Sequence, residues 1–166
     1  MLRHIARQPS LRLAICLLLI LPGLGMAQIL DVRDLNVNDI RALDRQRTVV
    51  ILQGGILEEH GPYLPVYADG WGNEYITRQL AEALVARPGW KVVIFPVIPL
   101  GSGGANQLGL KHSYPGTFAI RPATLRAVYM DLADELGQQG FRWVFLVNGH
   151  GAPSHNRALF DACDYY

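Results

Sequence analysis

The segment from Glu58 to Asp69 carries side chains that could hold a divalent metal ion. Glu58 and His60 are two positions apart, so in an extended backbone both side chains project to the same side while Glu59 projects to the other. Two prolines stiffen the loop that follows and leads to Asp69. A carboxylate, an imidazole and a second carboxylate suit Zn²⁺ or Mn²⁺, and three ligands leave room for water or substrate.

A second histidine follows an apolar run later in the chain, in the sequence Asn148-Gly-His150-Gly. An isolated Glu-x-His is common, and the proline-containing loop could be only a solvated connection between a strand and a helix. Two motifs that each follow a strand can, however, meet at one edge of a sheet. The candidate metal ligands are therefore Glu58, His60, Asp69 and His150.

Apolar strands and amphipathic helices alternate along the chain. Short apolar runs predict buried strands over 48–52, 91–98 and 141–147. Helical periodicity predicts helices over 70–86, 122–139 and from 156 onward, with a short connecting helix within 31–44. Uniformly apolar strands between helices indicate an α/β fold of three layers, a mostly parallel sheet with helices on both faces. Ligands of such sheets bind beyond the carboxyl ends of the strands, where both histidine motifs fall.

Three further features of the pattern lead to specific expectations. Apolar residues that recur every four positions, Ile76, Leu80 and Leu84, predict the buried side of the first long helix. Pro96 predicts that the second strand lies at a sheet edge or ends early. The glycine-rich loop from Pro99 to Thr117 is long enough to suggest a functional loop. Its candidate substrate contacts are His112 and Tyr114, although His112 could equally form hydrogen bonds only within the loop.

Composition and the N-terminal segment limit the remaining possibilities. The chain has 166 residues, about the length of one domain, and its net charge of +1 gives no reason to expect a nucleic-acid partner. Residues 1–27 combine a basic start, an apolar stretch and small residues before Gln28, which predicts a signal peptide and export to the periplasm or the medium. An uncleaved membrane anchor is the alternative; after cleavage we expect no stable membrane contact. Cleavage also removes Cys16 and leaves Cys163 as a packing residue.

Three segments together resemble the creatininase (creatinine amidohydrolase) family. The run 58–69 is similar to the family's Glu-x-His-Gly-Pro-x-Leu-Pro…Asp signature, 112–117 to its His-x-x-Phe-Pro-Gly-Thr, and 148–151 to its Asn-Gly-His-Gly. The resemblance implies an α/β fold with two divalent ions, zinc or manganese, that activate a water to hydrolyse a C–N bond of a small, often cyclic amide. By position, Glu58, His60, Asp69 and His150 match metal ligands, and Asp69 matches the carboxylate that bridges the two ions.

The sequence departs from this family at the second metal ligand set. Creatininase has a glutamate two positions after the histidine of Asn-Gly-His, where this chain has Ala152. The chain also ends at Tyr166, so we expect the metallohydrolase domain, 28–166, to be incomplete at its C-terminus. The competing hypothesis is an inactive fragment or a metal- or small-molecule-binding protein of the same fold, and a homo-oligomer is left open. Conceivable substitutes for the glutamate are Glu59, His155 and Asp161.

Overall fold

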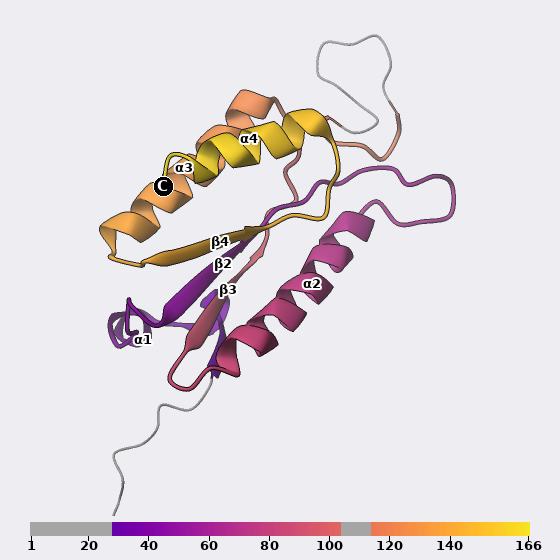
Figure 1. The fold of residues 1–166 in the computed structure, drawn as a ribbon. Helices are drawn as coiled ribbons and strands as arrows, with labels where there is room; N and C mark the ends of the chain where they lie inside the picture. Colours follow the sequence, from indigo (N-terminus) through magenta and orange to yellow (C-terminus); the bar gives the residue numbers. More distant parts are fainter. Residues whose placement is uncertain (1–27, 104–113) are drawn as a thin grey trace, which may run out of the picture.

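The computed structural model describes residues 28–103 and 114–166, and in these residues the strands form one parallel sheet (Figure 1). The strand order within the described part is β1-β3-β2-β4, with every neighbouring pair parallel. The bounds of the strands are β1 Gln28–Asp31, β2 Thr48–Gln53, β3 Lys91–Val97 and β4 Trp143–Val147. The expected α/β architecture with a mostly parallel sheet is therefore confirmed.

Helices cover both faces of the sheet (Figure 1). Helix α2 (Ala68–Val85) lies on one face, and α3 (Pro122–Gln138) and α4 (Pro153–Cys163) lie on the other. The alternation of side chains along β2 separates the two cores: Val49 and Ile51 pack with α2, whereas Val50 and Leu52 pack with α3 and α4. Because β2 is apolar on both faces, its six residues are all buried, which explains its uniformly apolar sequence.

The N-terminal part of the described chain differs from the expected connecting helix. Gln28–Asp31 pairs with β3 as the edge strand β1, and a single 3-10 turn, η1 (Val32–Asp34), follows it. Only α1 (Val37–Arg41) is helical, and it begins where Asn36 and Asp39 exchange hydrogen bonds as a capping box. The strand was missed because its structure depends on pairing with a distant segment, not on a local apolar pattern.

The expectation for Pro96 is that its strand lies at a sheet edge or ends early. The edge position is wrong, because β3 lies between β1 and β2, and β3 ends at Val97, one residue after the proline. The proline is tolerated there because pairing with β1 has already ended at Ile94. On the other side, the register with β2 is irregular between Ile51 and Gln53. The missing N–H of Pro96 therefore falls where the ladder is already interrupted.

Helix α2 is rotated relative to the predicted apolar stripe. Ile76 is 49% exposed, while the buried positions of the helix are Gly70, Asn73, Thr77 and Ala81. Leu80 and Leu84 contact the core only at its margin. Small and polar residues, rather than large apolar ones, thus allow α2 to approach the sheet.

In residues 28–103 and 114–166, no helix is both long and apolar enough to cross a membrane.

Candidate metal centre

Glu58 and His60 lie in the irregular segment that follows β2, and backbone contacts hold this segment in place. The N–H of Glu58 donates to the carbonyl of Val66 at 2.9 Å, which closes the proline-containing loop. The segment is also bound to the end of the glycine-rich loop: Phe118 N–H donates to Leu57 O at 2.9 Å, and Glu59 N–H donates to Thr117 Oγ1 at 3.0 Å. The candidate ligands are therefore positioned from two distant parts of the chain.

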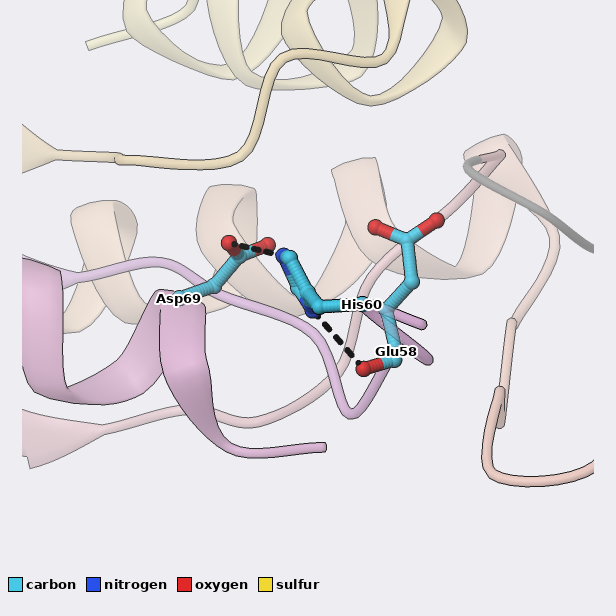
Figure 2. A group of neighbouring side chains, drawn as sticks. All are labelled: Glu58, His60 and Asp69. Atoms are coloured by element: carbon cyan, nitrogen blue, oxygen red, sulfur yellow. Dashed lines mark hydrogen bonds and ion pairs between the residues drawn. The ribbon is translucent and has the colours of Figure 1, made fainter. Parts of the chain in front are cut away.

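Asp69 lies in the first turn of α2, not in the loop, and its carboxylate lies between two histidines. Its Oδ1 is 3.1 Å from Nε2 of His60, and its Oδ2 is 2.9 Å from Nδ1 of His150. Figure 2 shows the Asp69 carboxylate turned toward the ring of His60, with Glu58 beside it. One ligand atom from each of Glu58, His60 and Asp69 lies within 4.8 Å of the others. One carboxylate oxygen thus faces each imidazole.

His150 follows β4 and completes the group. Its Nδ1 is 3.1 Å from Oε2 of Glu58 as well as 2.9 Å from Asp69. Asn148 fixes the turn: its Nδ2 donates to the carbonyl of His150 at 2.8 Å and to Oδ1 of Asn156 at 3.0 Å. The structure therefore brings all four predicted residues together, although Asp69 and His150 are 81 positions apart. The bracing by Asn148 and Thr117 was not predicted, although both residues belong to the motifs that carry the family resemblance.

Each nitrogen of the His60 ring faces an acceptor. Nδ1 is 3.0 Å from the carbonyl oxygen of Glu58, and Nε2 faces Asp69. The hydrogen bond to the Glu58 carbonyl raises the pKa of His60, burial opposes this, and the Asp69 carboxylate adds to the increase. A metal ion at Nε2 would have to displace a proton, while the bond at Nδ1 would keep the ring in the orientation required for coordination.

None of the three substitutes for a missing ligand joins the group of Glu58, His60 and Asp69 in the described structure. Glu59 accepts the N–H of Gly61 at 2.8 Å, and Asp161 forms an ion pair with Arg157 at 2.8 Å. His155 accepts the N–H of Ser102 at Nδ1, with a distance of 3.2 Å. Ala152, where creatininase has a glutamate, is the N-cap residue of α4 and has no side-chain atom that could bind a metal ion.

His155 packs directly behind the metal-site histidine. It is completely buried, and its ring lies edge-to-face against that of His150, with the two centroids 4.8 Å apart. Helix α4 begins at Pro153, three residues earlier than expected, and this places His155 on the first turn. Burial lowers the pKa of His155 to about 4, and the neighbouring His150 acts in the same direction. The buried ring is therefore neutral at pH 7.

Burial of His155 should make the fold sensitive to acid. Between pH 6.5 and about 4 the unfolded chain binds a proton that folded His155 does not, so the free energy of unfolding should decrease as the pH falls through this range. The full shift corresponds to at most about 3 kcal/mol. Urea unfolding of metal-free protein across this range, compared with the non-titrating variant His155→Gln, measures the effect. Stability curves that stay parallel would contradict this assignment.

Of the two candidate substrate contacts, the structure describes only Tyr114. His112 lies outside the described residues. Tyr114 is 50% exposed, and its carbonyl accepts the N–H of Thr117 at 3.3 Å in the turn that ends the loop. The contact of either residue with a substrate remains a prediction.

Comparisons with known proteins agree on one family and one fold. The family model described as creatinine amidohydrolase matches residues 33–165. A mycofactocin precursor peptide peptidase of Mycobacterium ulcerans is 31% identical over 107 residues, which cover 61% of this chain and 40% of that protein. A solved creatininase described as the manganese form superposes with a TM-score of 0.65 at 24% identity, over 81% of this chain and 50% of that one. A creatininase mutant described as Zn–Zn type gives 0.63 at 24% identity, over 81% and 49%. The chain thus spans about half the length of these proteins.

Proposed function

Because this chain belongs to the creatininase family, we propose that it is a metal-dependent amidohydrolase that cleaves a C–N bond of a small, possibly cyclic amide. The observation that carries the proposal is the Asp69 carboxylate, whose two oxygens face His60 and His150 at 3.1 and 2.9 Å. A carboxylate in this position can bridge two cations. The donor set of carboxylate oxygens and imidazole nitrogens is the one that zinc and manganese take in hydrolytic enzymes.

The residues present fit two divalent ions, zinc or manganese, in two overlapping ligand sets. Glu58, Asp69 and His150 would hold one ion, and His60 and Asp69 would hold the other. Ions bound there would lower the pKa of a water molecule and polarise the amide carbonyl. The chain's own residues supply the negative charge that balances the ions and fix both imidazoles in position. The similar creatininase structures, one a manganese form and one a Zn–Zn form, support these metals.

The test is hydrolysis of a panel of small linear and cyclic amides, creatinine included, by metal-loaded protein, with the product amine or ring-opened acid measured by mass spectrometry. We expect turnover that a chelator abolishes, that Zn²⁺ or Mn²⁺ restores, and that Asp69→Asn eliminates. Glu59→Gln is the matched control, because the Glu59 side chain bonds to Gly61 and not to the ligand group. Turnover that is unaffected by the chelator would contradict a metal-dependent reaction.

A second candidate function is metal or small-molecule binding without turnover. It is favoured by the ligand set, because Ala152 stands where creatininase has a glutamate, and the candidate substitutes Glu59 and Asp161 bond elsewhere. The same experiment separates the two functions. Protein that binds zinc with all four ligands intact but hydrolyses no amide in the panel would favour the binding function.

We also propose that the protein is exported and that its mature chain begins at or near Gln28. The support is the sequence of residues 1–27, with its basic start, apolar stretch and small residues before Gln28. N-terminal sequencing of protein recovered from the periplasm or the medium should show Gln28 or a neighbouring residue. Exported protein that retains Met1 or Leu2 would favour the membrane-anchor alternative.

A further inference from the structure

We propose that the amino edge of the sheet is a docking face for an anionic membrane surface. The amino-edge face consists of the three segments that lead into β2, β3 and β4, residues 42–47, 86–91 and 139–143. Backbone hydrogen bonds join these segments: Lys91 N–H donates to Arg47 O at 2.9 Å, and Arg142 N–H donates to Arg45 O at 3.3 Å. Because the strands are parallel, the metal group lies at the other end of the sheet (Figure 1), and the inference is independent of the proposed hydrolysis.

Positive charge is concentrated on the amino-edge face. Its sequence contains one acid, Asp44, and five cations, which are Arg45, Arg47, Arg87, Lys91 and Arg142. The chain from Gln28 onward is nevertheless acidic overall, because three of the 15 Lys and Arg precede Gln28, whereas all 14 Asp and Glu follow it. A basic face on an acidic domain separates the charges in space and attracts an anionic surface to one side of the molecule.

The cations of the amino-edge face are not neutralised by carboxylates of the described residues. In residues 28–103 and 114–166, the Arg and Lys that form ion pairs are Arg33 and Arg157, which lie outside this face. Asp44 accepts the N–H of Gln46 at 2.9 Å instead. The side chains of this face are therefore complementary to anionic headgroups, and each Lys or Arg at such a surface strengthens binding about five-fold.

Two tryptophans lie among these cations and favour a membrane over a soluble polyanion. The rings of Trp90 and Trp143 lie 6.1 Å apart, and both are half-buried against the core. The guanidinium carbon of Arg87 lies 6.0 Å from the ring centroid of Trp90, and that of Arg142 lies 5.1 Å from the ring centroid of Trp143. Tryptophan together with Lys and Arg is typical of the boundary between lipid and water, which accommodates an amphipathic ring beside a charged group.

The position of Gln28 supports the same partner. Gln28 begins β1 and pairs with Lys91, so the basic and apolar sequence of residues 1–27 joins the folded chain at the amino-edge face. A signal peptide and an uncleaved anchor would both bring this edge to a membrane during export. Docking through the face itself is reversible and depends on charge, unlike the stable contact of an anchor. It directs the metal group away from the lipid.

Quenching of tryptophan fluorescence by brominated phosphatidylglycerol in phosphatidylcholine vesicles tests the orientation in the full chain. The three tryptophans of the chain are Trp71, Trp90 and Trp143. The variant Trp71→Phe retains the two tryptophans of the amino-edge face, and we expect its fluorescence to be quenched. The variant Trp90→Phe/Trp143→Phe retains Trp71, which lies in α2 near the metal group, and should not be quenched. Equal quenching of both variants, or of neither, would overturn the inference.

Charge variants separate docking by the face from tethering by residues 1–27, which all variants share. In the Trp71→Phe background, Arg47→Gln/Arg87→Gln/Lys91→Gln should weaken partitioning onto the anionic vesicles about 100-fold, at about five-fold per cation. The matched control removes the same charge elsewhere, from three exposed arginines, as Arg78→Gln/Arg121→Gln/Arg126→Gln, and should partition like its parent. Circular dichroism verifies that each variant is folded. Equal partitioning of the two triple variants, or binding to heparin without binding to the vesicles, would overturn the inference.

Discussion

Replacing Asp69 by alanine is expected to remove nearly all bound metal, whereas replacing Glu59 by alanine should leave the metal content close to that of the wild type. The Asp69 carboxylate faces both His60 and His150, so its loss takes a ligand from each ion position. The loss of an anionic ligand also leaves less negative charge to balance two cations. Glu59 is adjacent in sequence but turned toward the N–H of Gly61, so its removal changes no ligand.

Elemental analysis of the three purified proteins after equilibration with the same Zn²⁺ concentration measures this difference. Asp69 is partly buried in the first turn of α2, so thermal unfolding of the metal-free proteins serves as the control for folding. The prediction requires that Asp69→Ala and Glu59→Ala both remain folded and that Asp69→Ala binds much less zinc than Glu59→Ala. Equal metal content in both folded variants, whether full or near zero, would show that these residues do not form the site.

The convergence of the metal group could be predicted from the sequence because parallel strands share one carboxyl edge. Glu58 follows β2 and His150 follows β4, and these strands are hydrogen-bonded neighbours from Val49–Trp143 to Gln53–Val147. Any side chains that follow two adjacent parallel strands must lie close together. A uniformly apolar strand predicts this sheet type, so the site could be inferred from the order of motifs and strands.

The orientation of α2 could not be predicted, because its contact with the sheet is polar. Asn73 is fully buried and its Nδ2 donates to the carbonyl of Gly54, immediately after β2. Thr77 is also buried on the same side, while the apolar Ile76 faces outward. Hydrophobic periodicity assumes that large apolar residues mark the buried side, and this helix reverses the assumption near the site. The first turn with Asp69 is thereby positioned by a hydrogen bond that has no periodic signal in the sequence.

The second large effect is expected from a glycine packed closely against the segment that leads to Glu58 and His60. Gly101 lies near the start of the glycine-rich loop, and its carbonyl accepts the N–H of Ile120 at 2.7 Å. A Cβ at this position would lie 2.3 Å from Cβ of Ile56 and 2.8 Å from the carbonyl oxygen of Gly55. One contact is with the β-carbon of Ile56 and the other with a backbone oxygen, so neither can be relieved by rotation of a side chain.

Gly101→Ala is therefore expected to lower the free energy of unfolding by about 3 kcal/mol, as overpacking of a rigid interior does. Because Ile56 lies two residues before Glu58, the displacement should also weaken zinc binding. Gly72→Ala is the matched control: Gly72 is exposed on α2, no described atom lies within 4 Å of its added Cβ, and alanine favours a helix by about 1 kcal/mol. Urea unfolding and zinc titration of both variants test the packing. If Gly101→Ala were as stable as Gly72→Ala and bound zinc equally well, packing at Gly101 would not support the segment that carries Glu58 and His60.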